Sequence, residues 1–123
     1  MICASAVSQD ERKVTSDQGR ALVLAGLTSQ QRRLRGLEAD PDRGYTSNFL
    51  FYTVTWAGTT DGSVVVGNYA VDPRTGDVFS STASCDEIHT KRLEALQRQV
   101  RFALHLSDSK YQKLKTKGPL CEE

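Results

Sequence analysis

The stretch that decides the fold is Tyr45–Ser80, YTSNFLFYTVTWAGTTDGSVVVGNYAVDPRTGDVFS, which predicts three antiparallel strands with turn residues at both joints. Its first segment, Asn48–Ala57, alternates between two faces and is rich in aromatic and β-branched residues. One face carries Leu50, Tyr52, Val54 and Trp56. Because this face is the more continuously apolar one, it is expected to meet the helices.

The two joints have the chemistry of tight turns. Gly58–Gly62 predicts a hairpin loop, and Ser63–Val71 predicts the second strand. Asp72–Gly76, DPRTG, places proline where a type I turn favours it and glycine where a positive φ is needed. Asp77–Ser80 then returns as a short third strand. Asp72 is expected to cap backbone N–H groups of the turn, which favours a structural role over a pair of catalytic carboxylates with Asp77.

Helices are predicted on both sides of these strands. Thr15–Gln18 has the form of a capping box and opens a short helix that ends at Gly26. Thr28–Gln31 is a second box, before a segment with too few apolar residues for more than a marginal helix. Glu38–Gly44 has the composition of a loop.

The C-terminal segment predicts another helix over Thr90–Leu104, followed by a further helical turn opened by Ser107–Lys110. The apolar stripe of the longer helix consists of Leu93, Leu96, Val100, Ala103 and Leu104. The pattern therefore predicts an α+β fold: an N-terminal helix, a three-stranded antiparallel meander and a C-terminal helix packed on one sheet face. These elements form a single domain over residues 15–123.

Composition excludes several classes of protein. The chain has 123 residues, 38% of them hydrophobic and 25% charged, which is typical of one globular domain. A net charge of +1 gives no general reason to bind nucleic acid. No apolar run is long enough to span a membrane.

The N-terminus allows two interpretations. Residues 1–14 are expected to be a flexible lead-in, and Ala4-Ser5-Ala6 resembles the cleavage site of a signal peptide. The segment is either the remnant of an export signal or an ordinary flexible N-terminus.

Three cysteines occur, Cys3, Cys85 and Cys121, without the spacing of a zinc site. We expect a disulfide between Cys85 and Cys121, which would close a loop of 36 residues and tie the C-terminal segment to the sheet. Such a loop stabilises a fold by about 3–4 kcal/mol. The alternative is two unpaired thiols. A disulfide implies an oxidising compartment, so a periplasmic or secreted location is predicted.

The search for catalytic residues favours a protein that is not an enzyme and needs no cofactor or metal. His89 and His105 have no cysteine or carboxylate placed to complete a triad. Neither a dinucleotide-binding glycine motif nor a phosphate-binding loop occurs.

The arginine run at Arg32, Arg33 and Arg35 suggests an oxyanion or acidic partner, because guanidinium pairs bidentately with oxyanions. Three acidic residues follow it in sequence: Glu38, Asp40 and Asp42. Since these acids are expected to neutralise the local field, the run is interpreted as a solvated loop.

Several of these segments together resemble a PepSY-type domain, over about Thr15–Ser80. The resemblance rests on the helix opening Thr15–Gln18 and on the Tyr-x-Val-x-Trp strand that begins at Tyr52. It also rests on the turn motif, whose residues are Val71, Asp72, Thr75, Gly76 and Val78. The resemblance implies an exported or envelope-associated module that binds or inhibits another protein and is not an enzyme.

The preferred function is therefore a small exported protein-binding or inhibitory module, whose partner is a hydrolase or a toxin. Immunity proteins that block a toxin delivered between cells are one version of it. The predicted contact residues are Phe49 and Phe51 on an exposed strand face, Thr60 and Asp61 on the hairpin loop, and Arg74 on the second turn.

Two further hypotheses remain open. One is a carrier of a small apolar ligand, with a cavity between sheet and helix lined by Trp56 and Tyr69. The other is a homodimer formed through a sheet edge, because the third strand is short and easy to extend by pairing.

Overall fold

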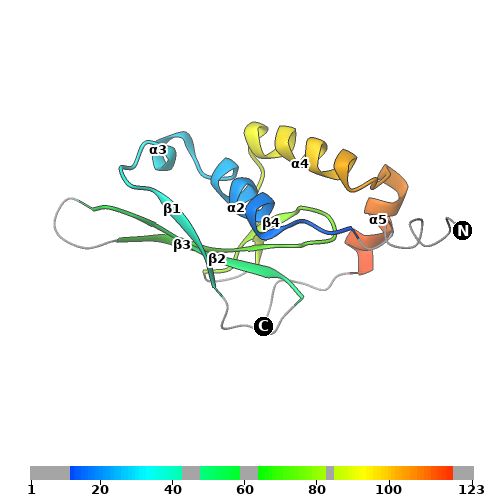
Figure 1. Cartoon of the computed structure of the whole chain (residues 1–123), viewed down its shortest axis with the longest axis horizontal. Helices are drawn as coiled ribbons and strands as arrows, with labels where there is room; N and C mark the ends of the chain where they lie inside the picture. The colour runs from blue at the N-terminus through cyan, green and yellow to red at the C-terminus, as the bar shows by residue number, and fades with distance from the viewer. Residues whose placement is uncertain (1–11, 43–47, 59–63, 83–84, 118–123) are drawn as a thin grey trace, which may run out of the picture.

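The computed structural model describes residues 12–42, 48–58, 64–82 and 85–117. Within them a single antiparallel sheet lies under a layer of helices, and Figure 1 shows α2 and α4 above one face of that sheet. The helices are α2 (Ser16–Ala25), α3 (Ser29–Arg32), α4 (Lys91–Ala103) and α5 (Asp108–Lys117). The strands are β1 (Glu38–Asp42), β2 (Leu50–Trp56), β3 (Val64–Val71), β4 (Val78–Ser80) and β5 (Asp86–Glu87).

Both predicted capping boxes are confirmed. Thr15 accepts a hydrogen bond from the backbone N–H of Gln18, whose side chain accepts from the Thr15 N–H in return. Thr28 and Gln31 form the same pair at the start of α3. Helix α2 ends at Gly26, as expected, and α3 is a single turn with no buried residue.

The sheet has five strands in the order β1-β2-β3-β4-β5, so the expectation of three strands is corrected. Residues 38–42, predicted as a loop, form β1 and pair with β2. Pro41 lacks an N–H donor, which an edge strand tolerates. Ala39 alone of these five residues is buried, and it belongs to the core. Such a strand owes its formation to pairing with β2, because its own sequence has little strand preference.

The apolar face of β2 meets the helices as predicted. Tyr52 and Val54 are fully buried in the main core, and Tyr69 lies directly opposite Tyr52 on β3. The pairing of β2 with β3 shifts register between Val54 and Thr55, which marks a β-bulge.

Helix α2 lies close to β2 at one point, where Tyr52 donates a 2.7 Å hydrogen bond to the Ser16 carbonyl. Gly19 lies beside that hydroxyl, and a Cβ at this position would overlap it. This contact explains a glycine in the middle of a short helix, where glycine ordinarily costs stability.

The Asp72–Gly76 turn has the predicted chemistry. The Asp72 carbonyl accepts from the N–H groups of Thr75 and Gly76, and its side chain accepts from the Arg74 N–H at 2.9 Å. Gly76 has φ +83°, a conformation that favours glycine. The geometry of the turn therefore explains why Asp72 and Gly76 occupy these positions.

The C-terminal segment gives α4 on the sheet and a longer second helix than the single turn expected. Leu93 and Val100 of α4 are buried in the main core. Ala103, which was predicted to lie on the apolar stripe, is exposed instead. Thr90 caps α4 and also donates a 2.9 Å hydrogen bond to the Ala25 carbonyl, which joins α4 to the end of α2.

The premise of the expected homodimer is wrong, because β4 pairs with β3 on one side and β5 on the other. The sheet edges are β1 and β5. Strand β1 carries three acidic residues and a proline, features that protect an edge from pairing with another chain.

The disulfide between Cys85 and Cys121 stays a prediction, because Cys121 and Cys3 lie outside the described residues. Cys85 is half-buried against a second apolar cluster formed by Phe49, Phe51 and Ala70. None of the described helices has the length and apolar character that crossing a bilayer requires.

Candidate functional site

The feature that stands out on the surface is at the end of α4. The Leu106 N–H donates to the Arg101 carbonyl and the His105 N–H donates to the Phe102 carbonyl, the two hydrogen bonds of a Schellman motif. His105 has φ +59°, and among the described residues no other non-glycine residue has a positive φ. A histidine in this conformation is strained where glycine is the usual choice.

Phe102 projects from the outer face of α4. It is nine residues after the buried Leu93, which at about 100° per residue places it on the opposite side of the helix. Of the large apolar side chains that the structure describes, three are exposed, and Phe102 is the most exposed at 86%. An aromatic ring in water at the surface is typical of a protein-contact residue, since aromatic residues are enriched at such contacts.

A surface cavity of about 380 Å³ lies at the same end of α4, next to the turn that contains His105. Its lining consists of Arg12, Lys13, Arg74, Leu104, His105, Leu106, Lys110 and Leu114. Leucines and cations contribute to it, and no carboxylate does. We call Phe102 together with this cavity the Phe102 corner.

The cations of the Phe102 corner differ in their partners. Arg12 donates a 3.1 Å hydrogen bond to the Ala103 carbonyl, and Arg74 is held by Asp72 at 2.9 Å. For the side chains of Lys13 and Lys110, the structure gives no ion pair within its described ranges. Two lysines are therefore available to an acidic partner beside leucine side chains.

A buried carboxylate holds α5 in place and so shapes the Phe102 corner. Asp77, with a side chain only 5% exposed, accepts 2.8 Å hydrogen bonds from Arg101 Nη2 of α4 and from Tyr111 Oη of α5. Thr75 donates to its other oxygen at 3.0 Å. The Arg101 guanidinium also stacks 4.1 Å from the centre of the Tyr111 ring.

A second ion pair extends this network to β5. Lys115 Nζ lies 2.8 Å from a carboxylate oxygen of Glu87 and 3.2 Å from Tyr111 Oη. Burial lowers the pKa of Lys115, but hydrogen bonds to Glu87 and Tyr111 raise it on balance. Burial and the hydrogen bond to Asp77 raise the pKa of the Tyr111 hydroxyl. Both groups therefore keep their protons at neutral pH, and the network serves to fix α5 on the sheet.

The residues predicted as contacts are not brought together. Phe49 and Phe51 are 7% and 6% exposed, so the expectation that they face a partner is wrong. Their rings pack on each other, with centroids 6.5 Å apart, and Phe49 also packs on Phe79 at 6.0 Å. Arg74 does lie in the Phe102 corner. Thr60 and Asp61 lie outside the described residues.

The sequence interpretation missed Phe102. Its signal was present, because Phe102 lies off the apolar stripe of α4 on the side where Lys91 and Arg98 also lie. Over the described ranges no group of three His, Cys, Asp or Glu side chains is placed to hold a metal ion. Five surface cavities in those ranges all include charged side chains, and Trp56 lines none of these five.

The comparisons with known proteins show the fold. No family model and no curated protein matches this chain, so the PepSY-type resemblance stays an interpretation of its motifs. Among solved structures, the chain is similar to one chain of a type VI secretion system effector–immunity complex from Pseudomonas protegens. That similarity has a TM-score of 0.63 at 19% identity, and it covers 87% of this chain and 89% of the other.

Proposed function

We propose that this chain is an immunity-type protein that binds an effector protein and neutralises it, and that the Phe102 corner is its docking surface. The observation that carries the proposal is the 86% exposure of Phe102 beside a cavity lined by leucines and cations, where the described residues give no ion pair for the side chains of Lys13 and Lys110. Exposed aromatic anchors flanked by basic residues are typical of the few residues that dominate protein–protein affinity.

Two further observations support the proposal. The fold extends over most of a chain taken from an effector–immunity complex. In addition, hydrogen bonds from Arg101 and Tyr111 to Asp77 hold the surface in shape before any partner arrives. A preformed surface loses less conformational entropy on binding, which favours tight inhibition.

The experiment is a protection assay in a bacterial host. Each protein encoded beside the gene for this chain is expressed with and without the chain, which is produced both with and without an export signal. We expect one neighbouring protein to arrest growth, the chain to restore growth, and the two proteins to co-purify as a stable complex. The export arms also test the predicted periplasmic or secreted location.

Variants connect protection to the Phe102 corner. Phe102→Asp should abolish protection, because it places a charge at the centre of the contact. Val65→Asp is the matched control: Val65 is 59% exposed and lies on β3, which begins at the end of the sheet away from α5 (Figure 1). Growth arrest that the chain never relieves, or no growth arrest by any neighbouring protein, would overturn the proposal.

A further inference from the structure

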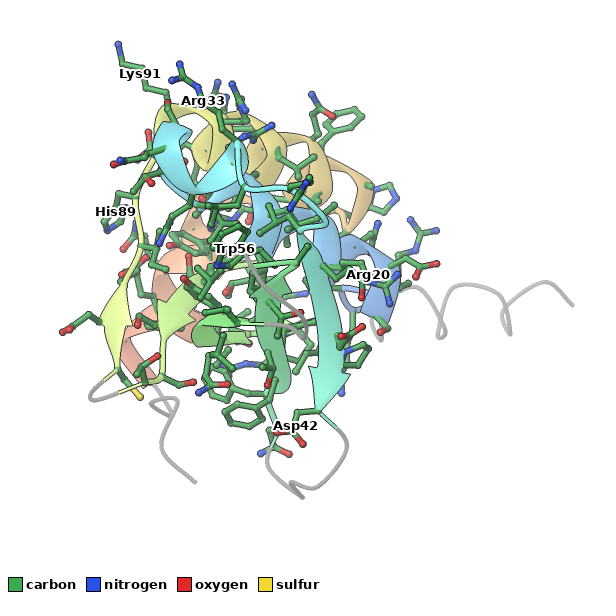
Figure 2. All side chains as sticks on the ribbon, turned by 90° about the vertical axis from the view of Figure 1, so that its left-hand side faces the viewer. Arg20, Arg33, Asp42, Trp56, His89 and Lys91 are labelled. Atoms are coloured by element: carbon green, nitrogen blue, oxygen red, sulfur yellow. The ribbon has the colours of Figure 1, made fainter. Side chains whose placement is uncertain are left out.

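A second basic surface lies at the opposite end of α4. A cavity of about 450 Å³ there is lined by Ala25, Leu27, Thr28, Ser29, Arg32, Thr90, Lys91 and Arg92. Arg33 is exposed next to Arg32 on the chain. We call Arg32, Arg33, Lys91, Arg92 and this cavity the α3–α4 basic groove. Figure 2 shows Arg33 and Lys91 projecting from the same end of the helical layer.

The four cations of the groove are all exposed. Within the described ranges, the structure gives no hydrogen bond or ion pair for the side chains of Arg32, Arg33, Lys91 and Arg92. The nearest acid on α4, Glu94, lies 3.7 Å from His89 instead. Three like charges line one cavity, with Arg33 next to Arg32 on the chain, and their mutual repulsion is relieved when an anionic group binds.

The position of two of these cations at the start of α4 also disfavours the folded state. Thr90 is the N-cap, so Lys91 and Arg92 occupy the first two positions of the helix. The helix dipole favours acidic residues there and disfavours basic ones. Stability therefore gives no reason for this arrangement, whereas binding an acidic group does.

The acids that were expected to neutralise the arginines lie on a separate element. Glu38, Asp40 and Asp42 lie along β1, paired with β2 at the edge of the sheet. Asp42 lies at the opposite end of the view in Figure 2 from Arg33 and Lys91. Arg32, Arg33 and Arg35 are exposed, as expected of a solvated segment, but the expected neutralisation by these acids is not found for Arg32 and Arg33 within the described ranges.

We infer that the α3–α4 basic groove binds an acidic segment of the protein partner. The inference rests on the proposed function, and it adds the chemistry of the partner's surface. Carboxylates fit the groove because guanidinium groups pair with them bidentately. The groove walls include Ala25 and Leu27, which suit the side chains of a polypeptide.

The two ends of α4 are close enough for one partner to cover both. Phe102 is eleven positions after Lys91, a rise of about 16 Å along the helix axis. A standard protein interface buries about 800 Å² on each partner, and a compact patch of that area is wider than the distance between Lys91 and Phe102. An extended polyanion such as nucleic acid is the weaker choice, because the net charge of +1 and the acidic edge strand β1 oppose it.

The test uses a labelled poly-L-glutamate peptide of about 20 residues as the acidic probe and a duplex DNA with a similar number of charges as its comparator. Fluorescence anisotropy of the full chain should show binding to polyglutamate that weakens about tenfold between about 50 and about 300 mM salt. The variant Arg32→Gln/Arg92→Gln should bind the peptide at least about fivefold more weakly. The control variant Arg98→Gln/Lys113→Gln, which removes two exposed cations outside the groove, should bind like the wild type.

Three results would overturn the inference: no binding of polyglutamate, equal losses in the groove and control variants, or tighter binding of duplex DNA than of the peptide. The assay contains no effector protein. Its failure is therefore separate from a failure of the proposed function, which the protection assay measures.

Discussion

The Tyr111 hydroxyl donates a 2.8 Å hydrogen bond to the buried carboxylate of Asp77, and this contact joins the last described helix to the turn before β4. Arg101 of α4 donates to the same carboxylate oxygen. One aspartate therefore fixes α4 and α5 relative to the sheet, and through them the cavity of the Phe102 corner.

The first prediction concerns that hydrogen bond. Tyr111→Phe should lower the free energy of unfolding by about 1.5 kcal/mol, because the bond is to a charged acceptor. It should also weaken effector binding, since α5 loses an anchor. Chemical denaturation measures the first effect. Tyr69→Phe is the control, because the structure gives no hydrogen bond for the Tyr69 hydroxyl within its described ranges; a loss as large in this variant would refute the explanation.

The second prediction concerns pH. The raised pKa values of Tyr111 and Lys115 stabilise the fold below the unfolded values of 10.0 and 10.5, and this stability is lost as pH rises through the folded values. The free energy of unfolding should therefore fall as pH rises above about 10. Lys115→Met should make this dependence less steep. Lys113→Met, at an exposed position, should keep the wild-type slope, and equal slopes in both variants would count against the network.

The third prediction concerns the close contact of α2 with β2. In an exposed helix, glycine to alanine stabilises by about 1 kcal/mol. Gly19→Ala should instead destabilise by about 2 kcal/mol, because the new methyl group overlaps the Tyr52 hydroxyl. The double variant Gly19→Ala/Tyr52→Phe should be more stable than the sum of the two single effects predicts. Thermal and denaturant unfolding measure these stabilities. Additive effects of the two substitutions would contradict the predicted overlap of the new methyl group with the Tyr52 hydroxyl.

The signals that predicted parts of the fold correctly are local ones. Thr15 and Thr28 form capping boxes with residues three positions later, and Asp72 and Gly76 interact within one turn. Each of these motifs is complete within a few residues, so the sequence around it contains the whole cause.

The features that were missed depend on distant partners. Strand β1 looks like a loop because Pro41 and three acids disfavour a strand, and pairing with β2 overrides that preference. Phe49 and Phe51 were expected at the surface but are buried in a second apolar cluster. The alternation of residues along a strand shows which side chains share a face, but it does not show whether that face is buried. Phe102 is meaningful only once the buried side of α4 is known.

The fourth prediction concerns His105. His105→Gly should stabilise the protein by about 1 kcal/mol, because glycine adopts the positive φ without strain. The same variant should weaken effector binding, since it removes a side chain from the Phe102 corner. His105→Ala removes the same side chain but keeps the strain, so it should weaken binding without the gain in stability. Equal stability of the two variants would contradict the claim that the positive φ of His105 is strained.

The central claim is that Phe102 is the anchor of a protein interface, and the direct measurement is the affinity of the Phe102→Ala variant for the effector found by the protection assay. Because the ring is 86% exposed, its removal should change the free energy of unfolding by less than about 0.5 kcal/mol. Titration calorimetry should show a loss of affinity of about 30-fold, or about 2 kcal/mol. Val65→Ala should bind like the wild type. Wild-type affinity in Phe102→Ala would contradict the claim.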